Sequence, residues 1–337
     1  MKEIYSYKKL RNNAAQCRTC AHYCILKNKE KGICGVRENK NGKIYSLVYG
    51  TACAVNIDPI EKKPFFHFLP GTKSLSIATV GCNFSCQSCQ NWSISQKPKI
   101  LGDVKGEKIS PNEIVELAVD RKLSSISYTY TEPTVFLEYA LDTMKLAKKK
   151  GLKNAWVTNG FLSDESIEKI APYLDAVNID LKSFSDDFYR KYCQGRLKPV
   201  LNTLKRLKKK GVWLEITTLV IPTLNDSENT FKEIAYFIKK ELGPKTPWHL
   251  TRFAGEISWK LQRLPNTPLK TLKKAWEIAE KAGLKYVYTG NAAGLESEDT
   301  FCPKCKEKMI ERLGYLVTRY DKSGKCSKCG ESLNIIE

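Results

Sequence analysis

Cysteine is the residue type in this chain whose spacing points most clearly to chemistry. Thirteen cysteines occur among 337 residues. Only Cys53 and Cys193 stand apart, and isolated cysteines are mostly small buried apolar residues. The others fall into three clusters in a long chain whose first residues lack an apolar export signal, a pattern typical of metal ligands and not of a disulfide framework. Thiolates favour zinc, copper(I) and iron–sulfur clusters.

The central cluster, Cys82, Cys86 and Cys89, has the spacing C-x3-C-x2-C and directly follows a predicted strand over 75–80. A structural zinc site closes with four ligands, so zinc here requires a distant fourth residue. Three thiolates on a [4Fe–4S] cluster instead leave one iron without a protein ligand. Such an open position can bind a small molecule, as open metal positions do in catalytic sites.

The carboxy-terminal set consists of Cys302, Cys305, Cys326 and Cys329, spaced C-x2-C-x20-C-x2-C. Four thiolates close a tetrahedral site, so we expect a zinc-ribbon-like module, with rubredoxin-like iron as the main alternative. The segment between the two pairs interleaves basic and aromatic residues. That composition suits contact with nucleic acid or an acidic peptide, and it equally suits a solvated hairpin.

The amino-terminal set consists of Cys17, Cys20, Cys24 and Cys34, spaced C-x2-C-x3-C-x9-C, with His22 as a possible substitute ligand. Zinc would fasten a small module that has little core of its own. An auxiliary iron–sulfur cluster would relay electrons or hold substrate. The spacing leaves both possibilities open.

Regular elements that could position these residues lie between the outer cysteine sets. The predicted strands are 75–80, 126–130, 154–158, 176–181, 212–220, 248–253 and 285–289, and the predicted helices are 111–122, 134–149, 197–209, 228–241 and 268–281. For the last helix we expect Thr267 at the N-cap. Alternating strands and helices favour a parallel sheet with right-handed crossovers. Six or seven such units favour a partial (β/α)6-type TIM barrel over a closed eight-stranded one.

The chain therefore divides into three predicted parts within the α/β class. Residues 1–70 form a cysteine-rich module, residues 71–295 form the barrel core, and residues 296–337 form the zinc-ribbon-like module. Active sites of such sheets lie at the carboxyl ends of the strands. The central cluster follows the first strand and is therefore expected there.

Charge and hydropathy indicate which partners and which compartment the chain suits. Lys and Arg number 56 against 36 Asp and Glu, a formal net charge of +20. This balance suits an acidic partner such as nucleic acid or an acidic protein face, and it equally suits a lysine-coated surface. The sequence has no run of 18 apolar residues, so we expect no membrane span and a cytoplasmic protein.

The C-x3-C-x2-C loop after the first strand of a partial barrel resembles the signature of radical S-adenosylmethionine (SAM) enzymes. More narrowly, the chain resembles the pyruvate formate-lyase activating enzyme-like branch, in particular the radical SAM enzyme of the AmmeMemoRadiSam system. The two outer cysteine sets contribute to the narrower resemblance. So do four short motifs: 58–64 (DPIEKKP), 67–71 (HFLPG), 81–83 (GCN) and 89–91 (CQN).

This resemblance implies a radical enzyme with two cofactors in its barrel. Cys82, Cys86 and Cys89 would ligate a [4Fe–4S] cluster, and SAM would chelate the open iron. One electron would cleave SAM to a 5′-deoxyadenosyl radical, which abstracts hydrogen from a substrate. The cofactors carry this chemistry, while the protein orients them and excludes water. The resemblance supplies neither the substrate nor a catalytic residue.

The resemblance also implies a set of residues that bind SAM. Glu132 would accept a hydrogen bond from the SAM amino group, Asp180 and Lys182 would lie beside its methionine part, and His249 would contact it. The full set is Glu132, Thr158, Asn159, Asp180, Lys182, His249 and Asn291. Structural alternatives remain: an Asp180–Lys182 ion pair, a core histidine, and Glu132 as a helix cap.

Two positions depart from the family pattern. Ser88 stands where radical SAM enzymes usually carry an aromatic or bulky residue near the adenine. Val157 stands where activating enzymes place an Asp before Thr-Asn-Gly, which argues against a cation site there.

Two classes of function follow from these observations. The first is a radical SAM oxidoreductase that either activates a glycyl-radical enzyme or modifies a macromolecule or metabolite. It requires an electron donor such as ferredoxin or flavodoxin, whose acidic surface would suit the basic chain. The alternative is a non-catalytic, zinc-stabilised nucleic-acid-binding protein, favoured by the charge and the zinc-ribbon-like module.

Overall fold

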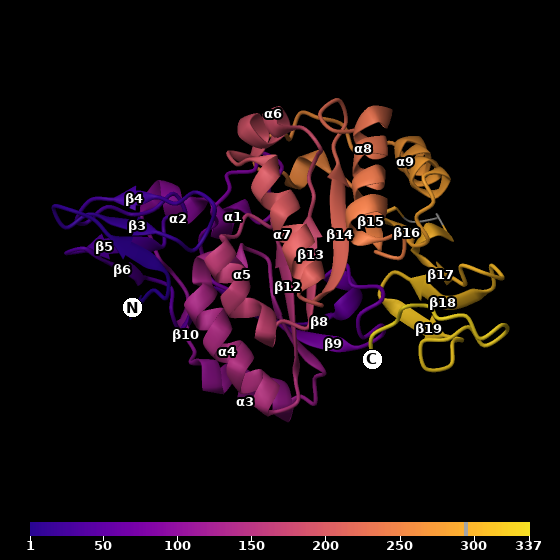
Figure 1. Cartoon of the computed structure of the whole chain (residues 1–337), viewed down its shortest axis with the longest axis horizontal. Coiled ribbons are helices and arrows are strands. Elements are labelled where there is room, and N and C mark those ends of the chain that lie inside the picture. Colours follow the sequence, from indigo (N-terminus) through magenta and orange to yellow (C-terminus); the bar gives the residue numbers. More distant parts are fainter. Residues whose placement is uncertain (293–295) are drawn as a thin grey trace.

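The structure is a computed structural model that describes residues 1–292 and 296–337. An open parallel sheet wrapped by helices forms the middle of the chain, and a small all-β module lies at each end (Figure 1). Within the described residues, no helix is both long and apolar enough to cross a membrane.

The core is an eight-stranded sheet in the order β16-β15-β14-β13-β12-β11-β9-β8. Seven strands are parallel, and β8 pairs with β9 in the antiparallel direction. Their bounds are β8 (Ala54–Pro59), β9 (Lys73–Ala78), β11 (Ser125–Tyr128), β12 (Lys153–Thr158), β13 (Ala176–Asp180), β14 (Trp213–Val220), β15 (Trp248–Arg252) and β16 (Val287–Gly290). All seven predicted strands are present. The two end strands do not pair, so the prediction of a partial, open barrel is confirmed.

Helices cover the outer face of this sheet and bury one apolar side against it (Figure 1). The long ones are α3 (Pro111–Asp120), α4 (Leu137–Lys149), α5 (Asp164–Ile170), α7 (Leu197–Lys209), α8 (Glu228–Phe237) and α9 (Leu269–Lys281). Three of them, α3, α5 and α8, begin with a serine whose side chain caps the helix, whereas α4, α7 and α9 have no side-chain cap. The Ser110 hydroxyl accepts a hydrogen bond from the Glu113 N–H, and the Glu113 carboxylate accepts one from the Ser110 N–H, which is a capping box.

The first turn of α9 differs from the prediction by one residue, since Pro268 and not Thr267 is the N-cap. The Thr267 hydroxyl instead donates to the Val220 carbonyl at 2.5 Å and accepts from the Phe253 N–H at 2.9 Å. It thereby joins α9 to the ends of two strands, and this tertiary use of the hydroxyl overrides its local capping preference.

Short helical pieces complete the connections between strands. They are α1 (Trp92–Ser95), α2 (Lys97–Leu101), α6 (Asp186–Phe188), η1 (Ile60–Lys62), η2 (Pro133–Phe136), η3 (Ala171–Tyr173), η4 (Tyr189–Cys193), η5 (Ile238–Leu242), η6 (Gly255–Ile257) and η7 (Glu296–Glu298). Two of them, η4 and η5, are π-helical turns that continue α6 and α8. The predicted helix over 228–241 is thus an α-helix that ends in a π turn, a feature its periodicity does not show.

The amino-terminal module has two small sheets, and one further pair of strands follows it. The strands are β1 (Lys2–Glu3), β2 (Tyr7–Lys9), β3 (Ala15–Cys17), β4 (Ile25–Leu26), β5 (Arg37–Lys40), β6 (Lys43–Ser46), β7 (Thr51–Ala52) and β10 (Glu107–Lys108). Its own core is small and consists of Ile4, Ala15, Cys17, Leu26 and Ile44. A core of this size supplies little stability, so attachment to the barrel or a bound metal is needed.

The segment between β8 and β9 lies inside the barrel and differs from the expected module over residues 1–70. β8 is the edge strand of the core sheet. Phe65 and Phe68, from the segment after β8, pack against Ala155 and Ala176 on the inner face of the sheet. Residues 54–70 therefore belong to the core by packing. An antiparallel edge strand ending in Pro59 has no counterpart among the βα repeats, so periodicity does not reveal it.

The carboxy-terminal module is a three-stranded antiparallel sheet of β17 (Thr300–Phe301), β18 (Lys308–Leu313) and β19 (Leu316–Arg319). It docks on the same internal segment: the Ile336 N–H donates to the His67 carbonyl, and the Leu69 N–H donates to the Ile336 carbonyl, both at 2.8 Å. The predicted boundary at residues 295 and 296 touches residues 293–295, which lie outside the described residues.

Candidate active site

The cysteine loop, residues 81–91, begins just beyond the carboxyl end of β9. Gly81 adopts φ +98°, and a Cβ there would lie 2.7 Å from a Val36 methyl and 2.9 Å from the Cys34 carbonyl oxygen. Only glycine fits this approach. The Ser85 N–H donates to the Cys193 carbonyl and the Gln87 N–H to the Tyr192 carbonyl, both at 2.9 Å. The loop is thus held against the amino-terminal module and against η4.

The three thiols of this loop have a low-polarity environment. Burial raises the pKa of the Cys82 and Cys89 thiols, and the Cys193 thiol together with burial raises that of Cys86. Metal ligation requires thiolates, so the incoming metal or cluster must displace the protons of these thiols. Cys193, which the sequence leaves outside every cluster, therefore lies against Cys86 in the fold.

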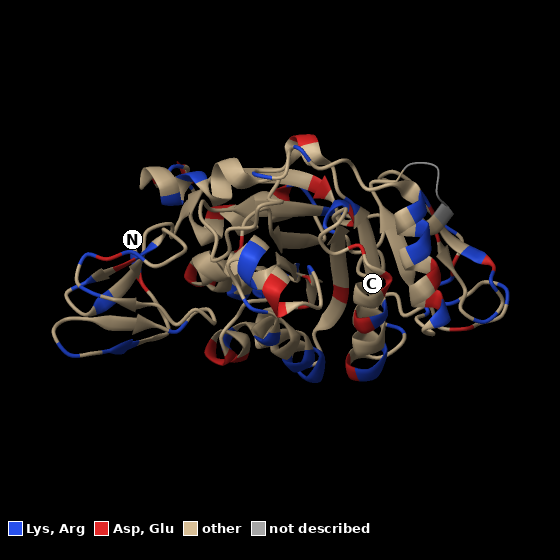
Figure 2. Ribbon diagram, turned by 90° about the horizontal axis from the view of Figure 1, so that it is seen from above, with Lys and Arg blue, Asp and Glu red and all other residues tan. Residues whose placement is uncertain are grey.

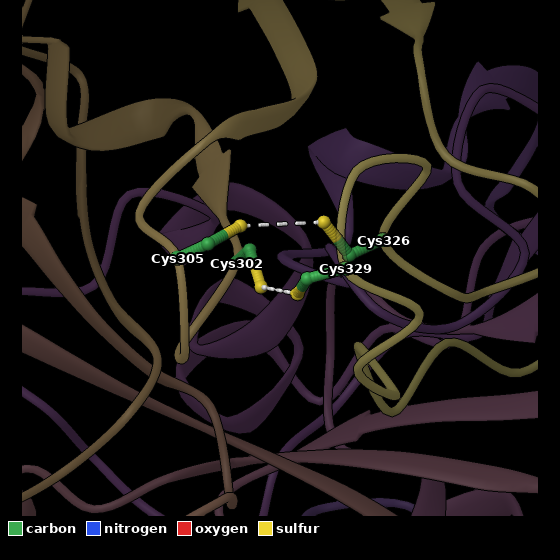
Figure 3. A group of neighbouring side chains, drawn as sticks. All are labelled: Cys302, Cys305, Cys326 and Cys329. Atoms are coloured by element: carbon green, nitrogen blue, oxygen red, sulfur yellow. Dashed lines mark hydrogen bonds between the residues drawn. The ribbon is translucent and has the colours of Figure 1, made fainter.

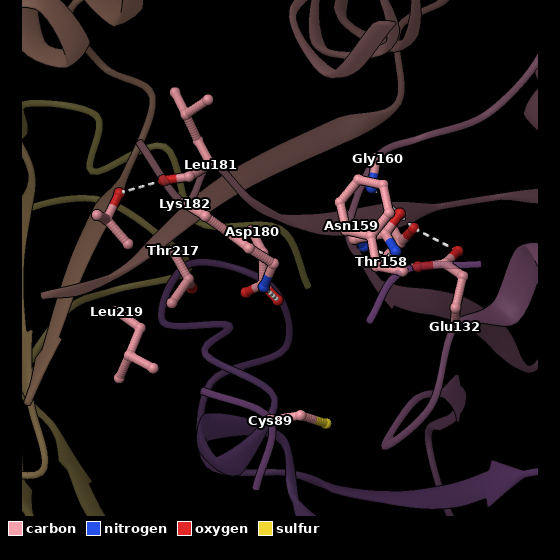
Figure 4. A network of polar contacts seen from close by, with 12 residues as sticks. Cys89, Glu132, Thr158, Asn159, Gly160, Asp180, Leu181, Lys182, Thr217 and Leu219 are labelled. Carbon is pink, nitrogen blue, oxygen red and sulfur yellow. Dashed lines mark hydrogen bonds and ion pairs between the residues drawn. The ribbon is translucent and has the colours of Figure 1, made fainter. Parts of the chain in front are cut away.

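Glu132 organises the polar network beside the cysteine loop (Figure 4). Its buried carboxylate accepts hydrogen bonds from the Thr158 hydroxyl at 2.7 Å and the Asn159 N–H at 2.8 Å. It also accepts from the Thr134 N–H at 3.0 Å and so caps η2. Burial raises its pKa, and these hydrogen bonds oppose the rise. The Asn159 amide in turn donates to Asn83 Oδ1 at 2.7 Å, which joins the network to the cysteine loop.

Asp180, the last residue of β13, and Lys182, two residues later, form an ion pair of 2.8 Å (Figure 4). The Lys182 N–H donates to the Tyr189 hydroxyl at 3.0 Å. Burial lowers the pKa of Lys182, but the Asp180 carboxylate and, once ionised, Cys86 and Cys193 raise it by more, so the net direction is upward. This cation therefore faces the cysteine loop, where an anionic group would be stabilised.

The other two predicted SAM residues lie elsewhere. His249 is buried, and its Nε2 lies 2.7 Å from Glu215 Oε2, among the rings of Phe66 and Tyr288. Asn291 is exposed just after β16, with φ +56°. The described contacts thus gather Glu132, Thr158 and Asn159 in one network and Asp180 and Lys182 in an ion pair, whereas His249 and Asn291 belong to neither group.

One interior network was not singled out from the sequence. The Tyr130 carbonyl accepts from the Asn91 side chain at 2.9 Å, and the Tyr130 hydroxyl donates to the buried Asp58 carboxylate. Lys63 pairs with Asp58 at 2.7 Å and lies 4.1 Å from the centre of the Tyr130 ring. The motif over 58–64 carried the resemblance, but its spacing gives no sign that Tyr130, far along the chain, completes the network.

The comparisons with known proteins bear on this site. The model of the radical SAM superfamily matches residues 76–234, from β9 to α8. The chain belongs to the radical SAM superfamily. An uncharacterized protein of Methanocaldococcus jannaschii is 43% identical over 339 residues and covers 100% of both chains. The pyruvate formate-lyase-activating enzyme of Clostridium pasteurianum is 25% identical over 176 residues, 50% of this chain and 71% of the relative.

A solved structure supports the same radical SAM fold. A radical SAM methyltransferase from Sphaerobacter thermophilus aligns with a TM-score of 0.50 at 14% identity, over 66% of this chain and 69% of that one. At this identity the likeness concerns the fold alone. In this radical SAM chain, Val157 packs against the apolar segment inside the barrel. The absence of a cation site at this position stays a prediction.

The carboxy-terminal set of the radical SAM chain is gathered tightly (Figure 3). The four sulfurs all lie within 4.8 Å of one another, with Cys302–Cys329 at 3.6 Å and Cys305–Cys326 at 3.5 Å. Zn–S bonds of about 2.3 Å place the sulfurs of a tetrahedral site about 3.8 Å apart. The arrangement therefore fits a single tetrahedral ion, zinc or iron.

The amino-terminal set is arranged differently. Cys17, Cys20, Cys24 and Cys34 line one small cavity, which His22 and Asn83 also line. Among the residues that the structure describes, only the carboxy-terminal set brings three or more Cys, His, Asp or Glu ligand atoms within 4.8 Å of one another. The sulfurs of the amino-terminal set and of the cysteine loop are thus spread more widely than in a single-ion site.

An open cleft of about 710 Å³ lies along the free β8 edge of the sheet. It is lined by β8, by α1 and α2, and by residues 103–107, and it reaches Val80 just before the cysteine loop. Pockets of roughly 300–1,000 Å³ hold small ligands or the end of a larger substrate. The cleft therefore borders the start of the cysteine loop, but Cys82, Cys86 and Cys89 do not line it.

Proposed function

We propose that this protein is a radical SAM oxidoreductase of the activating-enzyme type. Cys82, Cys86 and Cys89 hold a [4Fe–4S] cluster whose open iron binds SAM. When bound, the cofactors supply reductive cleavage of SAM to a 5′-deoxyadenosyl radical, which takes hydrogen from the substrate. The substrate is a glycyl-radical enzyme in another chain, or a macromolecule or metabolite to be modified.

One observation carries this proposal. Three thiols with C-x3-C-x2-C spacing stand at the carboxyl end of a parallel sheet, beside the Glu132–Thr158–Asn159 network and the Asp180–Lys182 pair. The thiols are too widely spread for a single tetrahedral ion. They fit the larger body of an iron–sulfur cluster, in which several irons stand between the sulfurs.

The residues of this chain take the remaining roles. Glu132 is oriented by its hydrogen bonds, so that its carboxylate opposes the positive charge of SAM and accepts from its amino group. Asp180 and Lys182 bind the methionine part. The Asn159 side-chain amide holds the cysteine loop through Asn83, which fixes the distance between the loop and the Glu132 network.

The proposed electron source is a low-potential ferredoxin or flavodoxin. Figure 2 shows Lys and Arg on both end modules and on the helices between them, with Asp and Glu interspersed. The +20 charge is therefore not confined to one module. An acidic donor gains association rate from such a surface. The same charge supports the alternative of a zinc-stabilised nucleic-acid-binding protein, but that alternative leaves the cysteine loop without a role.

Anaerobic reconstitution with iron and sulfide tests the proposal. The wild-type protein should turn brown, absorb at about 400 nm, and form 5′-deoxyadenosine from SAM and dithionite. Cys86→Ala should abolish this product. Cys53→Ala, at an isolated cysteine, serves as the matched control and should leave it intact. A colourless wild-type protein, or undiminished cleavage by Cys86→Ala, would contradict the proposal.

A further inference from the structure

We propose that the amino-terminal set, Cys17, Cys20, Cys24 and Cys34, binds a second [4Fe–4S] cluster, which delivers the electron to the cluster of the cysteine loop. The assignment of the cluster stands on the geometry of the amino-terminal module. Only its role as an electron carrier rests on the proposed function.

The space among the four thiols decides against a single ion. In the carboxy-terminal set the sulfurs approach to 3.5 and 3.6 Å, as one tetrahedral ion requires. Among the residues described, no three sulfurs of the amino-terminal set come within 4.8 Å of one another, although all four line one cavity. The same chain thus contains both a compact and a wide four-thiol site, and the spread of the wide one suits a four-iron cluster better than a single ion.

Gly32 borders this cavity. A Cβ there would lie 3.8 Å from the Cys34 sulfur and 3.9 Å from the Cys24 sulfur. Both thiols therefore lie on the same side of Gly32, within van der Waals reach of its Cβ position. None of the four cysteines forms a disulfide. Four free thiols around an enclosed space are the ligand set that an iron–sulfur cluster uses.

The two cysteine groups touch through their backbones. A Cβ on Gly81, the residue before Cys82, would lie 2.9 Å from the Cys34 carbonyl oxygen. The His22 Nε2, from the loop between Cys20 and Cys24, lies 2.8 Å from the Asn83 carbonyl oxygen. Clusters bound by these residues would therefore be separated by backbone groups in close contact and by one hydrogen bond, which is a suitable arrangement for transfer of one electron.

Lys99 lies between the two cysteine groups. Its ammonium donates to the Phe84 carbonyl at 2.6 Å, inside the cysteine loop, and its Cα lies 3.3 Å from the Cβ position of Gly35, next to Cys34. A half-buried cation at this point opposes the negative charge that two thiolate-ligated clusters bring together.

The electron balance is simple. A protein donor of the iron–sulfur or flavin class loses one electron, and the second cluster gains it. The second cluster then returns to its oxidised state as the cluster of the cysteine loop is reduced by the same electron. No bond in the protein forms or breaks, and no proton is transferred.

Iron, sulfide and zinc analysis of the anaerobically reconstituted full-length chain tests the site. The wild-type protein should hold about eight iron atoms. The double variant Cys20→Ala/Cys24→Ala and the triple variant Cys82→Ala/Cys86→Ala/Cys89→Ala should each hold about four. Cys53→Ala should hold as many as the wild type. About four irons and two zinc ions in the wild type would overturn the second cluster without the use of any variant.

Two further measurements test where the cluster lies and what it does. On reduction, the wild type should show an electron paramagnetic resonance spectrum broadened by spin coupling, and each variant should show a simple spectrum. With a flavodoxin-class donor, the double variant should cleave SAM at least about tenfold more slowly than the wild type, whereas dithionite should largely restore the rate. Equal losses with both donors would overturn the relay. SAM cleavage by the triple variant would instead contradict the proposed function.

Discussion

Glu215 and His249 form a buried pair at the inner face of the sheet, with Oε2 and Nε2 2.7 Å apart. The same carboxylate accepts from the Phe66 N–H at 3.0 Å, the His67 N–H at 2.9 Å and the Trp213 indole N–H at 3.0 Å. Burial alone would raise the pKa of Glu215, but the hydrogen bond and charge of His249 outweigh it and hold the pKa at about 2. The ionised carboxylate therefore fastens the internal segment inside the barrel.

Glu215→Gln should destabilise the protein by about 3–5 kcal/mol, because an amide cannot accept from all four donors and leaves buried groups unpaired. The free energy of unfolding from urea titration measures this loss. Glu168→Gln is the matched control, since Glu168 is exposed and pairs with Arg206 and Lys210 at the surface. It should cost at most about 1 kcal/mol. Equal losses in the two variants would show that Glu215 is not a structural anchor.

Titration of His67 should make the fold sensitive to mild acid. Burial lowers the pKa of His67 to about 4, from 6.5 in the unfolded chain, and Glu215 only partly opposes this. Between these two values the unfolded chain binds a proton that the folded protein does not. The free energy of unfolding should therefore fall by about 3 kcal/mol as the pH falls from 6.5 to 4.

Comparison with His67→Gln isolates this contribution, because metal loss in acid affects both proteins alike. The wild type should be the more stable at pH 7, and thermal melts should show its advantage shrinking as the pH falls towards 4. An advantage that stays constant over this range would mean that His67 does not titrate as described.

Glu132→Gln should weaken SAM binding and slow SAM cleavage by about tenfold or more, because one charge-assisted hydrogen bond is worth about 1.5–3 kcal/mol. The iron content should not change, since Glu132 lies outside the cysteine loop. Equilibrium dialysis with SAM and assay of 5′-deoxyadenosine measure the two effects. The exposed Glu116→Gln serves as the control. Unaltered SAM affinity in Glu132→Gln would leave Glu132 with only its role as the cap of η2.

Cys302→Ser/Cys305→Ser should release one zinc ion per chain and lower the melting temperature, while the iron content stays constant. The module depends on its ion because its apolar core is small. It also supports the barrel, since Arg312 donates to the Phe66 carbonyl at 2.8 Å. Elemental analysis and limited proteolysis of residues 300–337 would record both effects. Loss of iron in place of zinc would identify the ion as iron.

The sequence was sufficient for the repeating part of the fold. Each parallel strand except the last, β16, is a short run followed by a helix, and α3, α5 and α8 begin with serine caps, so local signals and tertiary structure agree. It was insufficient for residues 54–70, because an antiparallel edge strand and an apolar segment inside a barrel have no period of their own. Thr267 shows the same limit, since a hydroxyl that can cap a helix locally bonds two distant strands instead.

The candidate site, too, could be predicted from the sequence only in part. Cysteine spacing locates the thiols, because the ligands of one site lie close together in the chain. It does not distinguish a compact site from a wide one, which depends on how the loops fold. Cys193 beside Cys86, and Tyr130 above Asp58, are brought together by η4 and by the end of β11. Such contacts between distant segments follow only from the assembled barrel.

Lys99→Met should lower the reduction potential of the neighbouring iron–sulfur centres. The Lys99 ammonium contacts the Phe84 carbonyl and the Ser85 hydroxyl within the cysteine loop, at 2.6 and 3.1 Å. A nearby cation favours the reduced, more negative cluster, so its removal should shift the potential by roughly −60 mV, which is about 1.4 kcal/mol for one electron. Redox titration followed by electron paramagnetic resonance measures this shift.

Lys97→Met is the matched control for this substitution. Lys97 lies on the same short helix, α2, but its side chain is exposed, so water and salt screen its charge from the thiols. Its replacement should move the potential by less than about 15 mV, because a screened surface charge contributes only a few tenths of a kcal/mol. Equal shifts in the two variants would mean that net charge, and not the position of Lys99 between the cysteine groups, sets the potential.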